Sequence, residues 1–337
     1  MRTITVGVLG AGRIGRLHTE NLFRLKGVRV KAIADPYADF STWPPKDVAT
    51  GPDPELVLGD AEIEAVLICS PTPTHAPFTE AAATAGKHIF CEKPVDLDPD
   101  RIRKTLAVVE AAGVKMQVGF NRRFDPTFSR VRQAVTDGDV GDIHIVKITS
   151  RDPEAPPVSY VETSGGIFLD MTIHDFDMVR FVTGSEVEEV YAMGAVLIDP
   201  AIGEAGDVDT AITTLKMANG ALAVIENSRQ AVYGYDQRVE VFGSGGMVAV
   251  SNNLPDSAVV SDAEGVKGAP PLFFFLERYI SSYIAEMQAF VQCIQQDTEP
   301  PVTGLDARIP VVMGQAARKS YDENRPVRLS EIDGAVR

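Results

Sequence analysis

Over the first 120 residues, short apolar runs alternate with segments in which apolar residues recur every three or four positions. The short runs predict buried strands and the periodic segments predict helices. The predicted strands cover residues 3–9, 28–34, 65–69, 88–91 and 115–119, and the predicted helices cover residues 13–25, 75–85 and 99–112. Residues 37–54 contain four prolines, so we expect a loop there with at most one short helical piece. This alternation predicts an α/β, doubly wound parallel sheet.

After about residue 123 the pattern changes to successive strands with few helices. Strands are predicted over residues 143–151, 188–197, 209–217, 221–229 and 238–243, and helices over 165–183, 274–295 and 306–321, with a short extension over 326–329. Runs of strands separated by turn residues predict an open, mostly antiparallel sheet with helices, an α+β unit. We therefore expect two domains, 1–122 and 123–337, with the helix over 306–321 as a candidate to pack back on the first.

The charge balance narrows the classes of partner. The 337 residues carry a net charge of −15 and no basic run, which argues against nucleic acid as a partner. Three cysteines without a C-x-x-C spacing indicate a reducing compartment and no zinc site. No apolar run approaches the ~18–20 residues that span a bilayer, and the first residues do not resemble a signal peptide. We expect a cytoplasmic protein that binds neither membrane nor metal.

A dinucleotide fingerprint follows the first predicted strand. Gly10, Gly12 and Gly15 form G-x-G-x-x-G between a strand and a helix, and Asp35 follows the next strand. In this context the motif predicts a Rossmann domain, whose turn would bind the pyrophosphate through residues 10–14, namely Gly10, Ala11, Gly12, Arg13 and Ile14. Asp35 would accept hydrogen bonds from the ribose hydroxyls. No Arg or Lys follows it directly, which favours NAD over NADP. The alternative is a glycine turn that only packs two elements.

Two further groups of residues carry candidate chemistry. Lys93, in Glu92-Lys93-Pro94, follows a buried strand at the edge where doubly wound sheets bind ligands. Asp170 and His174 lie four apart on a predicted helix, hence on one face, and a carboxylate beside a histidine favours its protonated form. A surface lysine and a structural Asp–His pair are the respective alternatives.

Together, these motifs resemble the glucose–fructose oxidoreductase/inositol dehydrogenase (Gfo/Idh/MocA) family, most closely its inositol 2-dehydrogenase branch. The resemblance covers nearly the whole chain. It implies that Lys93 binds the reacting hydroxyl and the cofactor, that Asp170 orients and polarises, and that His174 is the general base. It also implies a homotetramer built through the second sheet. The implied cofactor contacts add Ser70, Pro71, Thr72, His75, Glu92 and Lys93 to the glycine turn, and the implied substrate contacts are Lys93, Arg123, Asp152, Asp170, His174, Tyr233 and Tyr235.

Two features depart from the family pattern. Asp152 stands where an asparagine is expected in inositol dehydrogenases, and the proline-rich residues 37–54 replace the usual helix after the second strand. The first leaves the preferred stereoisomer open.

We therefore expect NAD-dependent oxidation of a secondary ring hydroxyl of a cyclitol, myo-inositol or an isomer, to the ketone. The reaction would transfer a hydride from a small polyol substrate to C4 of the nicotinamide, with His174 as the general base. Three alternatives stay open: a sugar dehydrogenase or reductase of the same family, an NAD-retaining glycosidase, and a non-catalytic dinucleotide sensor.

Overall fold

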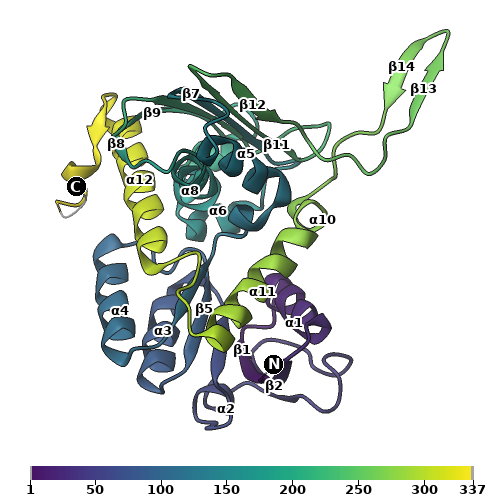
Figure 1. The fold of residues 1–337 in the computed structure, drawn as a ribbon, viewed down its shortest axis with the longest axis vertical. Coiled ribbons are helices and arrows are strands. Elements are labelled where there is room, and N and C mark those ends of the chain that lie inside the picture. Colours follow the sequence, from purple (N-terminus) through teal and green to yellow (C-terminus); the bar gives the residue numbers. More distant parts are fainter. Residues whose placement is uncertain (1, 335–337) are drawn as a thin grey trace. The chain divides into compact units, whose positions relative to one another are not determined.

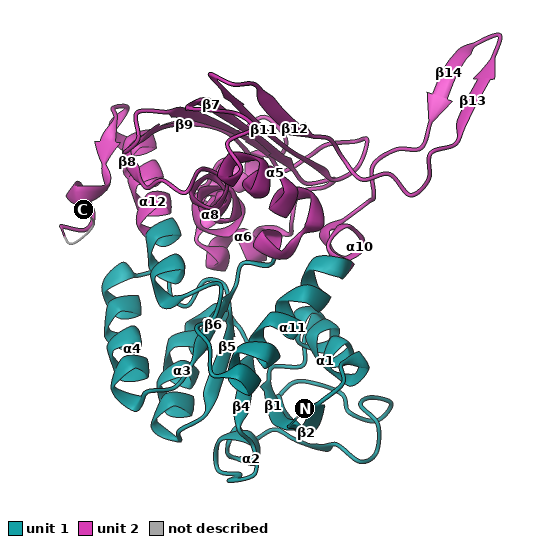
Figure 2. Ribbon diagram, viewed as in Figure 1, with its two compact units in different colours: residues 1–121, 281–311 teal, residues 122–280, 312–337 magenta. Residues whose placement is uncertain are grey.

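The computed structural model describes residues 2–334 and divides the chain into two compact units. Unit 1 comprises residues 1–121 and 281–311, and unit 2 comprises residues 122–280 and 312–337 (Figure 2). The sequence analysis placed a single boundary after residue 122. In the structure the chain leaves unit 1 after residue 121, returns for residues 281–311, and enters unit 2 again within its last long helix.

Unit 1 is built on a six-stranded sheet in the order β3-β2-β1-β4-β5-β6, and every adjacent pair is parallel. Its strands are β1 (Ile4–Leu9), β2 (Val28–Ala34), β3 (Ala49–Gly51), β4 (Ala65–Ile68), β5 (His88–Glu92) and β6 (Met116–Gly119). All four residues of β4 are buried, as expected for a strand covered on both faces. The predicted Rossmann sheet is therefore confirmed.

The sequence signals located three helices of unit 1 over residues 13–24, 75–84 and 99–112, but missed a short helix over residues 55–58. The helices of unit 1 are α1 (Arg13–Arg24), α2 (Glu55–Leu58), α3 (His75–Thr84), α4 (Pro99–Ala112) and α11 (Ile280–Gln296), with the 3-10 turn η1 (Thr72–Thr74) (Figure 1). Asp98 caps α4 by accepting a hydrogen bond from the Asp100 N–H, and Gly113 ends it in the left-handed conformation. Met287 and Phe290 of α11 complete the core against Phe90 of the sheet.

The proline-rich stretch was predicted incompletely. The expectation of a loop over residues 37–54 was wrong at β3, which pairs in parallel with β2. Its three residues, Ala49-Thr50-Gly51, are too few and too polar to show a strand pattern, and pairing with β2 rather than propensity orders them. The preceding loop is anchored by Arg16, whose guanidinium lies 5.0 Å from the ring centroid of Trp43.

Unit 2 is built on a seven-stranded sheet in the order β12-β11-β7-β10-β9-β8-β15. Its strands are β7 (Ile143–Arg151), β8 (Val187–Ala195), β9 (Thr210–Met217), β10 (Leu222–Ser228), β11 (Asp236–Gly243), β12 (Met247–Val250) and β15 (Val327–Arg328). Only the β7–β10 pair is parallel among these neighbours, so the predicted mostly antiparallel sheet is confirmed. A separate hairpin, β13 (Val259–Asp262) and β14 (Gly265–Gly268), extends away from the rest of unit 2 (Figure 2).

The helices of unit 2 correct two predictions. The predicted helix over 165–183 is two helices, α7 (Gly166–Asp170) and α8 (Thr172–Thr183), and the predicted helix over 274–295 divides at Tyr279 into α10 (Phe275–Arg278) and α11. Apolar periodicity continues through both breaks, so it could not locate them. The sequence analysis also missed α5 (Pro126–Thr136), α6 (Val158–Ser164), α9 (Pro200–Glu204) and the 3-10 turns η2 (Asn121–Phe124) and η3 (Leu329–Glu331), whereas α12 (Gly304–Glu323) was expected.

Within residues 2–334, none of the helices combines the length and the apolar character that crossing a membrane requires.

Candidate active site

The three glycines of the turn between β1 and α1 have different surroundings. Gly10 has a φ of +98°, and a Cβ atom there would lie 2.5 Å from the backbone nitrogen of Ser70. A Cβ atom on Gly15 would lie 2.1 Å from the carbonyl oxygen of Gly10, so only glycine permits this packing. A Cβ atom on Gly12 would instead meet no atom within 4 Å, and no side chain caps α1. The space beside Gly12 at the start of α1 fits a phosphate group, which the first N–H groups of the helix would bind.

Asp35 is fixed beside this turn. Its Oδ2 accepts a hydrogen bond of 2.7 Å from the Ala11 N–H, and its Oδ1 accepts from the N–H groups of Tyr37 and Ala38 at 2.7 and 3.1 Å. Three backbone donors hold the carboxylate in one orientation, partly exposed at the end of β2. In this place it suits the ribose hydroxyls of NAD and would repel a 2′-phosphate.

The loops after β4 and β5 are joined by a buried histidine. The Nε2 atom of His75 lies 2.6 Å from the carbonyl oxygen of Ser70, and its Nδ1 atom lies 2.7 Å from that of Pro94. The ring therefore links the segment Ser70-Pro71-Thr72 to Glu92-Lys93-Pro94. These are the predicted cofactor residues that follow neighbouring parallel strands, and the structure brings them together at one sheet edge.

Glu92 is held by a residue that the sequence analysis left without a function. The fully buried His18 places its Nε2 atom 2.7 Å from Oε1 of Glu92, while Oε2 of Glu92 accepts a 3.2 Å hydrogen bond from the Lys93 N–H. Gly119 permits this arrangement, because a Cβ atom there would lie 2.9 Å from Oε2. The His18–Glu92 pair thus fixes the backbone of Lys93 through its N–H group. Lys93 itself is partly exposed.

Asp170 is the last residue of α7, and the interruption at Met171 separates it from α8. The prediction that Asp170 and His174 share one continuous helix was therefore wrong. Oδ1 of Asp170 accepts a 2.8 Å hydrogen bond from the Tyr160 hydroxyl, and Oδ2 lies 3.3 Å from Nη1 of the buried Arg229. Both carboxylate oxygens therefore contact donors, which hold the side chain in one orientation.

His174 lies in the first turn of α8, partly exposed, directly before the buried Asp175. Asp175 accepts hydrogen bonds from Arg122 at 2.6 Å and from Asn227 at 2.8 Å, and Asn227 also accepts from the Thr172 hydroxyl. This network fastens the start of α8 to β10 and therefore fixes the backbone that carries His174.

Asp152, one of the predicted substrate contacts, has an altered acidity. Burial, with a smaller contribution from the negative charge of Asp170, raises its pKa to about 7 against the opposing effect of the cations Arg229 and Arg122. Asp152 follows β7 and is partly exposed. It can therefore exchange a proton near neutral pH, which an asparagine at this position could not do.

The remaining predicted contacts have different surroundings. Arg123 makes a bidentate ion pair with Asp177, at 2.9 Å from Nε and 2.6 Å from Nη2. Tyr235 is buried, and its hydroxyl lies 3.4 Å from Nη2 of Arg122. Tyr233 is 45% exposed and donates to Asp236 at 2.6 Å. The two tyrosines thus differ in burial and in their hydrogen-bond partners. The network around Asp175 contains Arg122 and not its neighbour Arg123.

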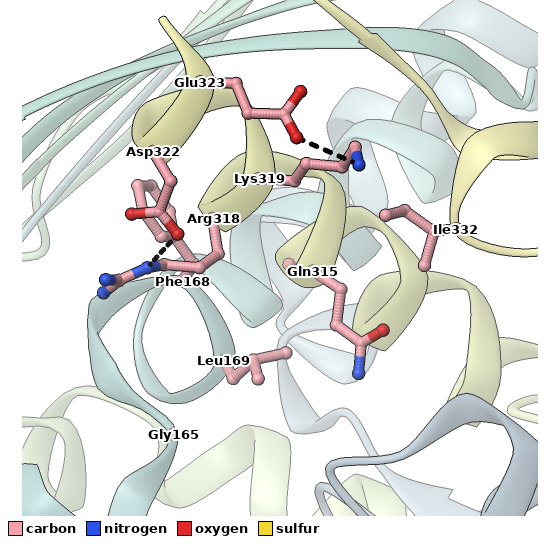
Figure 3. A pocket seen from close by; sticks show the side chains of 10 residues that line it. Gly165, Phe168, Leu169, Gln315, Arg318, Lys319, Asp322, Glu323 and Ile332 are labelled. Carbon is pink, nitrogen blue, oxygen red and sulfur yellow. Dashed lines mark hydrogen bonds and ion pairs between the residues drawn. The ribbon is translucent and has the colours of Figure 1, made fainter.

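A cavity of about 340 Å³ in unit 2 lies between α7 and α12 (Figure 3). Leu169 and Gln315 line it, and two ion pairs within α12, Arg318–Asp322 at 2.9 Å and Lys319–Glu323 at 3.1 Å, stand at its rim. Its lining includes Leu169 but neither Asp170 nor His174, so the cavity is not the candidate site.

Comparison with known proteins identifies the family of this chain. Residues 4–120 match the model of the oxidoreductase family's NAD-binding Rossmann fold, and residues 128–249 match the GFO/IDH/MocA C-terminal domain. The chain is 48% identical to an uncharacterized oxidoreductase of Bacillus subtilis (98% of each chain) and 46% identical to the myo-inositol 2-dehydrogenase of Thermotoga maritima (98% of this chain, 99% of that one). The structure of scyllo-inositol dehydrogenase from Lactobacillus casei with bound NAD(H) and scyllo-inositol is similar with a TM-score of 0.91 at 31% identity, covering 98% of this chain and 100% of that one.

Proposed function

Because the chain belongs to the GFO/IDH/MocA family of NAD-binding oxidoreductases, we propose that it oxidises a secondary ring hydroxyl of a cyclitol, myo-inositol or an isomer, to the ketone. One observation carries the proposal. The Asp170 carboxylate is held by Tyr160 and Arg229, and the partly exposed His174 follows four residues later in the first turn of α8. That pair suits removal of a hydroxyl proton near neutral pH.

NAD is the cofactor, and residues of unit 1 would hold it. The turn over residues 10–14 would bind the pyrophosphate, Asp35 the ribose hydroxyls, and the segments Ser70–Thr72 and Glu92–Lys93, joined by His75, the nicotinamide half. Bound NAD supplies the acceptor for the two electrons and the carbon-bound hydrogen that leave the alcohol.

The residues of the chain would handle the proton and the charge. His174 removes the hydroxyl proton as the general base, and Asp170 orients His174 and stabilises its protonated form. The ammonium group of Lys93 stabilises the negative charge that develops on the same oxygen. If the three side chains act on the same oxygen, they should behave as one catalytic unit in mutational tests.

Arg123, Asp152, Tyr233 and Tyr235 are proposed as substrate contacts, supported by the family resemblance. Asp152 gives this group its distinctive chemistry, because a carboxyl near its pKa can donate or accept a hydrogen bond to a ring hydroxyl. We propose that Asp152 contributes to the choice between inositol stereoisomers.

We further propose a homotetramer built through the sheet of unit 2. Exposed apolar residues occupy one face of this sheet, because the register pairs Met193 with Ile212, Leu222 with Ile145, Ile145 with Phe242, and Phe242 with Met247. These residues form two clusters, because Leu222 pairs with Lys216 and Ile212 pairs with Glu226 between them. Exposed apolar clusters of this kind occur at protein–protein interfaces.

The direct test is to incubate the protein with NAD and single inositol isomers and to identify the product by NMR. We expect an inosose, the ketone formed by loss of two hydrogens, from at least one isomer. A product from open-chain or pyranose sugars alone would reassign the enzyme to the sugar dehydrogenases of the family.

A further inference from the structure

A chain of polar contacts in unit 2 runs from Tyr160 through Asp170 to the buried Arg229 and Asp207. The Tyr160 hydroxyl donates to one oxygen of Asp170, and Nη1 of Arg229 lies 3.3 Å from the other. Nη2 of Arg229 lies 3.6 Å from Oδ2 of Asp207. The side chain of Arg229 has no exposed surface, so one guanidinium lies between two carboxylates away from water.

Arg229 is paired less completely than Arg180 and Arg123, two other arginines of unit 2. Arg180 and Arg123 each make a bidentate pair with one carboxylate, Arg180 with Glu186 at 2.7 and 2.8 Å. Arg229 instead divides its contacts, and within residues 2–334 its Nε and Nη2 atoms make no hydrogen bond. Burying a cation without full pairing is costly, so a role in packing alone does not account for this placement.

Asp207 ties the same arrangement to the start of α7. Its two carboxylate oxygens accept the Ile167 N–H at 3.1 and 3.0 Å. Gly166, at a φ of +75°, makes room for it, because a Cβ atom there would lie 2.7 Å from Oδ1 of Asp207. Asp207 therefore holds the first turn of α7, while Arg229 holds Asp170 at its last residue. This accounts for the glycine at position 166.

We propose that Arg229 is a positioning residue that orients the Asp170 carboxylate and sets its charge, with Asp207 competing for the same guanidinium. This inference rests on the proposed function, in which Asp170 supports His174 as the base. It makes Arg229 a further determinant of the pH range in which the enzyme works.

The charged groups around Asp170 fix the expected directions. Tyr160 on α6 and the buried Arg229 both contact Asp170. Asp152, after β7, interacts electrostatically with Asp170 and Arg229, and Asp207 is the second partner of Arg229. A second cation, Arg122, is committed to Asp175. Arg229 thus pairs with both Asp170 and Asp207, and together with Arg122 it opposes the rise in the pKa of Asp152.

Removing Arg229 leaves more negative charge around Asp170 and His174, and this raises both of their pKa values. Removing the charge of Asp207 has the opposite effect, because Arg229 is then balanced by fewer carboxylates. A purely structural role would give both changes the same sign, namely loss of stability and activity at every pH.

The test measures kcat against pH for Arg229→Gln, Arg229→Lys and Asp207→Asn. We expect Arg229→Gln to lower kcat ~10-fold or more. The acid limb, the part of the profile in which kcat rises with pH, should move to higher pH by ~1 unit. Arg229→Lys should restore most of the limb position, and Asp207→Asn should move it down. Arg180→Gln is the matched control, because it removes a buried, paired arginine of the same unit and should lower stability without moving the limb.

A second readout does not depend on turnover. With ¹³C-labelled aspartate carboxyl groups, the Asp170 resonance, assigned by its loss in Asp170→Asn, should titrate at higher pH in Arg229→Gln and at lower or equal pH in Asp207→Asn. If wild type oxidises no cyclitol, the proposed function fails, and the titration still tests Arg229.

The proposal is overturned if Arg229→Gln leaves both the limb and the Asp170 titration where wild type has them. It is also overturned if Asp207→Asn moves them upward. The second criterion decides the matter even if Arg229→Gln does not fold.

Discussion

Asp152 offers the prediction with the most direct magnitude. Its pKa rises from an ordinary 3.8 to about 7 in the folded protein, chiefly through burial. Well below pH 3.8 the carboxyl is protonated in both the folded and the unfolded chain, and it then leaves the free energy of unfolding unchanged. As the pH rises toward 7 the unfolded chain releases the proton first, so the stability present at low pH is progressively lost.

A difference of about 3 in pKa corresponds to about 4 kcal/mol at about 1.36 kcal/mol for each unit. Asp152 is partly exposed, and solvent screening reduces this to ~2 kcal/mol. Asp152→Asn removes the titration, so its free energy of unfolding relative to wild type should increase by ~2 kcal/mol between about pH 4.5 and about pH 8.

The assay is urea unfolding at both pH values, followed by near-ultraviolet circular dichroism. Asp142→Asn is the control, because Asp142 is exposed in the same unit and its replacement should leave the wild-type pH dependence unchanged. Equal stability differences for Asp152→Asn at the two pH values would show that Asp152 ionises normally in the folded protein, and would refute the reasoning.

Three further predictions concern the cofactor, the catalytic residues and the assembly. NAD should be used at least ~10-fold more efficiently than NADP, or about 1.4 kcal/mol, and Asp35→Ser should narrow this ratio of kcat/KM; equal use of both cofactors by wild type would contradict the role of Asp35. We expect kcat to fall by ~10²-fold or more in each of the variants Lys93→Ala, Asp170→Asn and His174→Ala. The double variant Asp170→Asn/His174→Ala should have a kcat scarcely lower than that of the worse single variant. Losses that multiply in the double variant would argue against one catalytic unit. Light scattering at micromolar concentration should find a tetramer, which Ile212→Glu on the exposed sheet face should dissociate, and a monodisperse monomeric wild type would rule out the interface.

Local signals predicted much of the fold because they act over a few residues. Asp98 and Gly113 bound α4 as expected, since capping depends on neighbouring backbone groups. The glycine turn and Asp35 were recognisable for the same reason. The three-residue strand β3 was not, because its order comes from pairing with β2 and not from its own composition.

The residues of the candidate site also divide into those that local sequence signals identify and those that only long-range contacts bring together. Lys93, Asp170 and His174 stand in recognisable motifs, but their supports do not. His18 is 74 residues from Glu92, and Arg229 is 59 residues from Asp170, so only the folded chain brings these partners together. Nothing in the sequence separates Arg229 from the arginines that make ordinary ion pairs. The break at Met171 was equally hidden, because the residues around it keep an apolar helical pattern.

The central claim is that this chain oxidises a cyclitol with NAD through His174. The most direct measurement follows the absorbance of reduced nicotinamide across the pH range, with a panel of inositols and hexoses, for wild type and His174→Ala. We predict that wild type reduces NAD with at least one inositol, that its rate rises with pH as His174 deprotonates, and that His174→Ala loses both the rate and this pH dependence. Most of the wild-type rate with an unchanged acid limb in His174→Ala would contradict the assignment of the base, and reduction of NAD by hexoses alone would contradict the substrate.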